Sequence, residues 1–175
     1  SLKTIELDMI QLLPLSKPVR TAKDYKAYLT RTLLNRLFKM RMNAWAFENP
    51  SYRKASIQYS SFLNATGVLL CSVELLPGKM EKGISEFIAQ QQQIFRYGFT
   101  ETEIEHAKKV IYNNLENKLQ NQQNPASVEL MNDIYADFYV GNRFTSLQEE
   151  YRLVQRYFPE LDSVALVRNL AKVYS

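Results

Sequence analysis

The sequence predicts an α+β fold, a small, mostly antiparallel sheet packed against several helices. Two observations predict it. Before Met80, several stretches alternate apolar with polar residues as strands do, and a turn signal separates two of them. From Met80 onward, apolar residues recur at helical spacing. A sheet-forming part is therefore expected to precede a helical part.

The first two elements are expected to be a strand and a long helix. The strand would cover Thr4–Leu13 and be half-buried, because apolar residues alternate with polar ones at Ile5, Leu7 and Met9. Thr21 followed by Asp24 is typical of a helix capping box. Apolar residues then recur at helical spacing, which predicts a helix over Ala22–Met42.

A loop and a hairpin are predicted next. The segment after Met42 contains Pro50 and the only tryptophan, so we expect a loop with at most one helical turn there. A strand near Ser56–Leu63, a turn over Asn64–Gly67 and a return strand over Val68–Leu75 follow. The return strand is an unbroken apolar run, which indicates burial on both faces or a central place in the sheet.

Two helices open the second part. The first is predicted over Met80–Tyr97, with Gly98 as its C-terminal stop. Its inward face would carry Met80, Ile84, Phe87, Ile88, Gln91, Ile94 and Phe95. The second would turn inward Ile104, Ala107, Ile111, Leu115 and Leu119.

Three further helices complete the predicted fold. Asn124 and Pro125 form a cap and first-turn pair for a helix that runs to about Val140. Ser146 with Glu149 opens the next helix, which Pro159 ends. Asp162 caps the last helix, whose inward residues would be Val164, Val167, Leu170 and Ala171.

Length and composition indicate one globular domain over residues 1–175, with 46% hydrophobic and 23% charged residues. No stretch approaches the roughly 20 apolar residues that a bilayer span needs, and no signal-peptide pattern is present, so no membrane anchor is expected. The formal charge of +4 comes without a run of Lys or Arg, which argues against a nucleic-acid partner. Because the first residue is Ser, we expect a processed form or a piece of a longer protein.

Glu103 and His106 are the strongest candidate for a metal site. Their Glu-x-x-His spacing puts both side chains on one helical face, as in carboxylate-bridged di-iron bundles. Such a site takes two of these pairs, and His106 is the only histidine. A zinc site would have to combine His106, Cys71 and a carboxylate from different elements. We therefore expect a solvated helix-face histidine and no metal site in this chain.

Other catalytic arrangements are not supported. Every nucleophile triad would depend on His106 as its base, and the five glycines form no phosphate-binding loop. The single cysteine, Cys71, is expected to be a small buried residue, and it leaves the redox compartment open. The acid pair Glu149 and Glu150 is expected on a solvated helix face. No catalytic residue is predicted.

Some basic residues adjoin aromatic ones and could in principle stack on nucleic acid. The examples are Arg96 beside Tyr97, and Arg53 and Lys54 beside Tyr52. They are spread thinly, so we interpret them as surface side chains whose stems cover apolar neighbours. A nucleic-acid-binding helical module therefore ranks last among the functional hypotheses.

Three phrases carry a family resemblance. A helix ends in an Asn-Arg-Leu phrase within TAKDYKAYLTRTLLNRLFKMR, and a strand leads through a Pro-Gly turn into a helix within VELLPGKMEKGISEFIAQ. A helix start of the form G-[FV]-[ST]-x-x-E-[IL]-x-x-A-[KR] is matched by Gly98, Phe99, Thr100, Glu103, Ile104, Ala107 and Lys108. In this order, and over nearly the whole chain, these phrases resemble the insulinase and pitrilysin family of zinc metallopeptidases.

The resemblance implies the fold of a mitochondrial-processing-peptidase-like metallohydrolase domain, truncated at its N-terminus. Members of this family resemble inverted zincins, which bind zinc through His-x-x-Glu-His and a distal Glu, and that motif is absent here. The chain therefore resembles a non-catalytic domain, similar to the second domain of long bacterial members. The family's R-x-x-x-G-x-x-Y phrase is not matched either, so no substrate-binding residue is carried over.

The function implied is that of a chamber wall, which encloses and positions peptides while zinc sits in the catalytic domain of a parent peptidase. Its partners would be the other domains of the parent chain and peptide substrates, and the bacterial periplasm is favoured as its location. The chain alone should be inactive. Through an open sheet edge it could self-associate. The alternative is a catalytically inactive scaffold or interaction domain of the same family.

The segment Gly98–Lys109 is then interpreted as a helix beginning. Thr100 and Glu103 form a reciprocal capping box, and Phe99 with Ile104 fits a hydrophobic staple. Lys108 and Lys109 can pair back to Glu105. His106 would be a bystander on that helix face.

Overall fold

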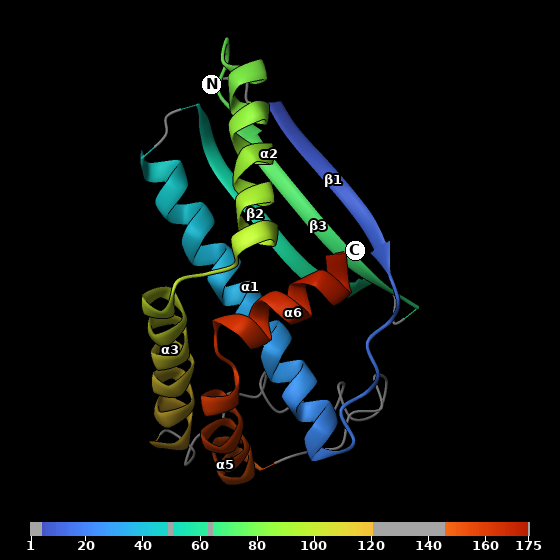
Figure 1. The fold of residues 1–175 in the computed structure, drawn as a ribbon, viewed down its shortest axis with the longest axis vertical. Coiled ribbons are helices and arrows are strands. Elements are labelled where there is room, and N and C mark those ends of the chain that lie inside the picture. The colour runs from blue at the N-terminus through green and yellow to red at the C-terminus, as the bar shows by residue number, and fades with distance from the viewer. Residues whose placement is uncertain (1–4, 49–50, 63–64, 121–145, 175) are drawn as a thin grey trace.

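The computed structural model describes residues 5–48, 51–62, 65–120 and 146–174, with side chains as far as Leu170. These residues form a three-stranded sheet and five α-helices, the α+β fold that the sequence predicts (Figure 1). The elements are β1 (Ile5–Leu13), α1 (Ala22–Glu48), β2 (Tyr52–Phe62), β3 (Thr66–Leu75), α2 (Met80–Tyr97), α3 (Glu101–Gln120), α5 (Leu147–Tyr157), the 3₁₀ turn η2 (Phe158–Glu160) and α6 (Ser163–Tyr174). The helix predicted from Pro125 to Val140 lies outside the described residues.

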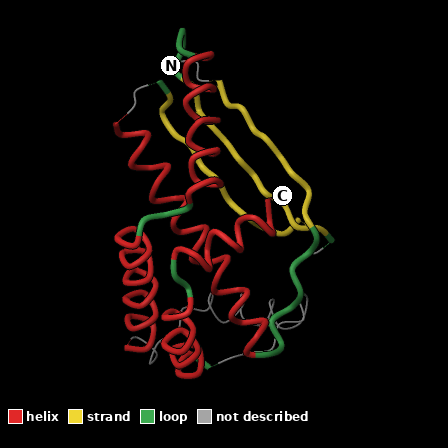
Figure 2. Tube along the Cα trace, in the orientation of Figure 1, coloured by secondary structure: helices red, strands yellow, loops and turns green. Residues whose placement is uncertain are grey.

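The sheet is antiparallel, and β3 lies at its centre in the order β1-β3-β2 (Figure 2). Cys71 of β3 is opposite Met9 on one side and Ile57 on the other. Along β3, buried residues alternate with half-buried ones, so one face packs on the helices and the other is only partly covered. The predicted central place of this strand is confirmed. The predicted half-buried face of β1 is confirmed only in part, because Leu7 and Met9 are partly buried but Ile5 is 50% exposed.

Helix α1 is longer than predicted, and the predicted loop after Met42 is wrong as far as Glu48. The helical spacing of buried side chains continues through Met42 to the partly buried Trp45 and Ala46, which explains why the helix does not stop. Trp45 stacks on Tyr52, with ring centroids 6.2 Å apart. Tyr52 is only 1% exposed and is the first residue of β2. The strand therefore begins four residues before the predicted Ser56.

Helices α2 and α6 pack on the same face of the sheet as α1. In Figure 1, α2 crosses β3, which it contacts, and α6 lies against α2. The predicted bounds of α2 are confirmed, but its inward face is turned from the predicted one. Gly83, Phe87, Gln90 and Ile94 are buried, whereas Met80 and Ile88 are 46% and 38% exposed. The close approach of Gly83 to the sheet sets this rotation.

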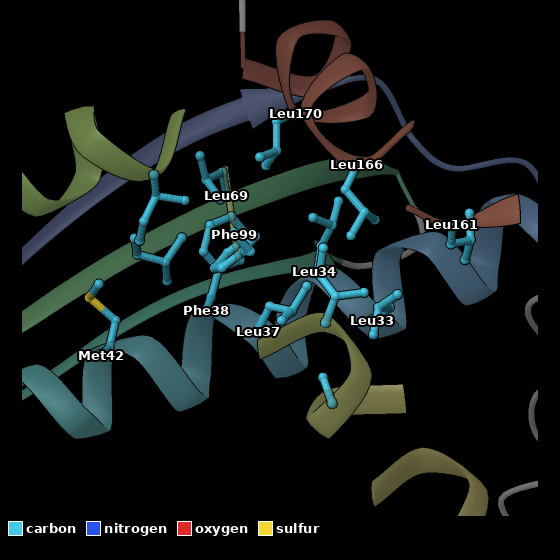
Figure 3. Close-up of a cluster of buried hydrophobic side chains, with 14 of the residues drawn as sticks. Leu33, Leu34, Leu37, Phe38, Met42, Leu69, Phe99, Leu161, Leu166 and Leu170 are labelled. Carbon is cyan, nitrogen blue, oxygen red and sulfur yellow. The ribbon is translucent and has the colours of Figure 1, made fainter. Parts of the chain in front are cut away.

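The core lies where α1, β3, the start of α3 and α6 meet. Figure 3 shows side chains from α1, among them Leu37 and Phe38, directed toward Leu69 of β3 and Leu170 of α6. The predicted inward place of Val164 is wrong, because this residue is 65% exposed. Leu170 is buried as predicted, and Leu166, one helical turn before it, takes the inward place instead of Val164.

Candidate functional site

A groove of about 550 Å³ runs along the outer edge of β2, between α1 and α3. Residues 54–58 of β2 form its floor. Asn35, Arg36 and Lys39 line it from α1, and Ile111 and Asn114 line it from α3. This volume falls in the range typical of ligand sites. We call this site the β2 groove.

One lining residue of the groove, Asn35, binds the backbone of β2 through its side-chain amide. Its Nδ2 donates to the carbonyl oxygen of Tyr59 at 2.9 Å, and its Oδ1 accepts from the Tyr59 amide at 2.9 Å. A neighbouring strand would offer the same donor and acceptor pair. Asn35 therefore occupies the place of one residue of an added strand.

Next to Asn35, the edge of β2 borders the groove. In an antiparallel strand, the backbone groups of alternate residues point to opposite edges. Since the N–H and C=O of Tyr59 point away from β3, those of Ile57 and Ala55 do so too, and both residues line the groove. In the described part of the chain no strand pairs with this edge. Backbone donors and acceptors without a strand partner thus border the groove at the spacing of alternate strand residues, although Ala55 and Ile57 are only 4% and 2% exposed.

The groove is positively charged. Arg36, Lys39 and Lys54 contribute cations, and no Asp or Glu belongs to the lining. Within the described ranges, none of these three side chains makes a hydrogen bond or ion pair, and the Nε of Arg36 is buried without a partner. Buried unpaired polar groups are rare, because they lose their hydration without compensation.

The wall that α3 contributes is held in place by an ion pair. The guanidinium of Arg41 on α1 donates from Nε and Nη2 to the two carboxylate oxygens of Glu103, which also accepts from the Thr100 backbone at 2.8 Å. Partial burial opposes ionisation of Glu103, but the hydrogen bonds from Arg41 and Thr100 outweigh it, so the pKa of this carboxyl lies below its ordinary value. Arg41 also lies over the ring of Phe99, 5.1 Å from its centroid.

The segment around His106 is a helix start, as predicted. Thr100 and Glu103 exchange the hydrogen bonds of a capping box, and Lys108 pairs with Glu105 at 2.8 Å. His106 itself is exposed on α3. The ion pair of Glu103 with Arg41 was not predicted, and it gives this residue a second structural role.

Cys71 and the acid pair are structural. Cys71 is buried in β3, as predicted, and burial raises the pKa of its thiol to about 11. Glu149 is exposed, but the expectation that both acids are simply solvated is wrong for Glu150. Its Oε1 accepts a hydrogen bond from the Tyr25 hydroxyl at 3.0 Å, which ties α5 to α1.

The basic residues beside aromatic ones do not form a stacking surface. Arg96 lies over the ring of its neighbour Tyr97, 5.7 Å from the centroid, and Arg53 pairs with Glu74 at 3.5 Å. Tyr52 is buried in the core, so its ring is not accessible to a base. Of these residues, only Lys54 belongs to the groove.

The described residues offer neither a metal site nor a membrane-spanning helix. There, no group of three or more His, Cys, Asp or Glu side chains is placed to hold a metal ion. None of the helices in the same ranges has the length and apolar character needed to cross a bilayer.

Similar solved structures place this fold. The periplasmic protease PqqL from Escherichia coli matches 99% of this chain with a TM-score of 0.85 and 15% identity. The fold is that of an insulinase-family peptidase domain. A predicted insulinase family protease from Yersinia pestis matches 95% of the chain with this fold, at a TM-score of 0.79 and 11% identity. The inactive domain of a peptidase M16 from Pseudomonas fluorescens matches 97% of it, at 0.70 and 14%.

The chain spans only part of the length of the proteins that share its fold. It spans 19% of the PqqL chain, 36% of the Yersinia chain and 38% of the Pseudomonas chain. No family model and no curated protein matches the sequence. The fold expected from the sequence phrases is therefore confirmed by structural likeness.

The groove residues were missed in the sequence. Asn35 and Arg36 belong to the Asn-Arg-Leu phrase that carries the family resemblance, but their contacts with β2 could not be inferred from it. A signal was present, because Thr32, Asn35, Arg36, Lys39 and Asn43 form a polar stripe at helical spacing along this helix. Such a stripe is ordinarily a solvated helix face. Only the position of β2 shows that this stripe is instead a wall of the groove.

Proposed function

We propose that this chain is a non-catalytic domain of an insulinase-type zinc peptidase, in which it forms part of a chamber wall and positions peptide substrates. The observation that carries the proposal is the β2 groove, where the backbone groups of Ala55 and Ile57 have no strand partner in the described residues and line a space of about 550 Å³. The inactive peptidase M16 domain with the same fold supports a role without catalysis.

The remaining parts of the proposal concern the parent protein. Because the chain spans less than two fifths of the PqqL, Yersinia and Pseudomonas chains above, we propose that residues 1–175 are one domain and that its partners are further domains of the same protein. Zinc would be held by one of those domains. The periplasmic protease PqqL supports a periplasmic location. Self-association of the isolated chain would use β1, the other outer strand, where Ile10 and Leu12 are 65% and 71% exposed.

The first test measures the binding of a fluorescent, unstructured peptide to the purified chain by fluorescence polarisation. Strand addition uses the N–H groups of alternate peptide residues. Two control peptides of the same sequence therefore carry N-methyl groups at the odd or at the even positions. We expect one of these two sets to abolish binding and the other to be tolerated.

Two outcomes would contradict the proposal. If both N-methylated peptides bind as well as the unmodified peptide, the contact is not strand addition. If no unstructured peptide binds the folded chain, the inactive scaffold becomes the better account. In parallel, metal analysis and a peptide cleavage assay should find neither stoichiometric zinc nor cleavage, and one tightly bound zinc per chain would argue against a non-catalytic domain.

A further inference from the structure

The geometry points to a specificity of the β2 groove for peptides with an acidic side chain, which Arg36 would bind. This inference rests on the proposed function, since it concerns the same site. It adds the chemical class of peptide and the residue that selects it.

The charges of the groove favour an acidic ligand. Its cations come from two elements, Arg36 and Lys39 on α1 and Lys54 on β2, and no acidic residue lines it. Other cations of α1 have partners: Lys26 pairs with Glu160, Arg41 pairs with Glu103, and Arg31 lies over the ring of Tyr59. The groove therefore concentrates positive charge without its own counter-charge, and a bound carboxylate would supply it.

The position of Arg36 supports the same inference. Its side chain is half-buried, and its Nε is shielded from solvent without a hydrogen-bond partner in the described residues. Arg36 follows Asn35, which binds the β2 backbone at Tyr59, and Arg36 and Ile57 both line the groove. A guanidinium binds a carboxylate through two parallel hydrogen bonds, and one of these can use Nε.

The geometry of an added strand restricts the positions at which the peptide can carry its acidic residue. Side chains of such a strand alternate between the two sheet faces, at about 3.3 Å per residue. Only every second side chain would point to the face that α1 covers. The selected peptide should therefore need its acidic residue at one parity, and an acid at the neighbouring position should have little effect.

The test compares two peptides that differ only by Glu or Gln at one central position, by fluorescence polarisation with the folded chain. We expect the Glu peptide to bind about tenfold more tightly, as one charged bidentate contact allows. Arg36→Gln should reduce this ratio to about one while the Gln peptide binds as before. Lys82→Gln is the matched control, because it removes the same charge from exposed α2, outside the groove, and should leave the ratio unchanged.

The outcomes separate this inference from the proposed function. If both peptides bind equally to the unaltered chain, or if Arg36→Gln and Lys82→Gln lower the ratio equally, acidic selection by Arg36 is overturned while peptide binding stands. If neither peptide binds, both proposals are overturned. A far-ultraviolet circular dichroism spectrum and a thermal melt of each variant confirm that the fold is intact, and Arg36→Lys keeps the charge but should recover only part of the ratio.

Discussion

Arg41 on α1 and Glu103 at the start of α3 are joined by two parallel hydrogen bonds, although 62 residues separate them in the chain. The Glu103 carboxylate at the same time completes the capping box of α3, since it accepts hydrogen bonds from the backbone and hydroxyl of Thr100. A single carboxylate thus begins one helix and fastens it to another. The β2 groove depends on this arrangement, because α1 and α3 form its two walls.

Removal of Arg41 should destabilise the fold. Arg41→Ala leaves the partly buried Glu103 carboxylate without its main partner, and we expect a loss of about 1–3 kcal/mol in the free energy of unfolding. Urea unfolding measures it. Arg152→Ala is the control, because it breaks the exposed pair with Glu149 and should cost less than about 1 kcal/mol. Equal losses in the two variants would contradict the structural role of the Arg41 pair.

The same carboxylate should make stability depend on pH. The pKa of Glu103 is lower in the folded chain than its ordinary value of 4.5, so the folded state binds fewer protons there. Its contribution to stability is complete above that ordinary value and is lost as the pH falls through the folded pKa. We expect Glu103→Gln to flatten the fall of the unfolding free energy below about pH 4.5, whereas Glu81→Gln, an exposed carboxylate on α2, should not. If the unfolding free energies of the two variants fall in parallel as the pH decreases, Glu103 is not a source of this pH dependence.

The capping box of α3 should contribute to stability, whereas the exposed His106 of the same helix should not. Thr100→Ala removes the hydroxyl that accepts from the Glu103 amide at 3.3 Å, and it should cost about 1 kcal/mol. His106→Ala should stay within about 0.5 kcal/mol, because its side chain is exposed. Chemical unfolding of both variants tests this pair. A larger loss for His106→Ala than for Thr100→Ala would return His106 to the list of functional residues.

Much of the fold can be predicted from local signals. The box of Thr21 and Asp24 and the box of Thr100 and Glu103 are both present, and Ser146 and Asp162 also act as caps. Such signals require only neighbouring residues, so the starts of α1, α3, α5 and α6 are where they were expected. The bounds of α2 are predicted equally well, because Gly98 stops it with a positive φ of 71°.

Features that depend on distant residues could not be predicted. Trp45 was interpreted as part of a loop because Pro50 follows closely, but its ring stacks on Tyr52 and the helix continues through it. Val164 looked like an inward residue by spacing, whereas the packing of α6 on α2 turns Leu166 inward instead. The groove is the clearest case, since the contact of Asn35 with Tyr59 joins elements that no local pattern relates.

Gly83 had no explanation in the sequence, and the structure supplies one. A Cβ atom at this position of α2 would lie 2.6 Å from Cδ2 of Leu75 and 2.9 Å from the carbonyl oxygen of Ser51. The steric overlap in Gly83→Ala should cost about 1–3 kcal/mol of unfolding free energy. The better helix propensity of Ala offsets about 1 kcal/mol of this cost, so we expect a net loss of stability. Thermal unfolding tests it, with Ser85→Ala on the exposed face of α2 as the control. A stabilised Gly83→Ala variant would mean that α2 does not approach the sheet so closely.

The most direct test of the central claim is residue-resolved amide hydrogen exchange of β2, measured by NMR with and without a saturating unstructured peptide. The amides of Ala55 and Ile57 point into the β2 groove, whereas those of Ser56 and Gln58 are directed toward β3 and serve as internal controls. If a peptide adds to this edge, exchange at Ala55 and Ile57 should slow by about tenfold or more, and exchange at Ser56 and Gln58 should change little. Unchanged exchange at Ala55 and Ile57 with bound peptide would contradict the proposal that this domain positions peptides at the β2 edge.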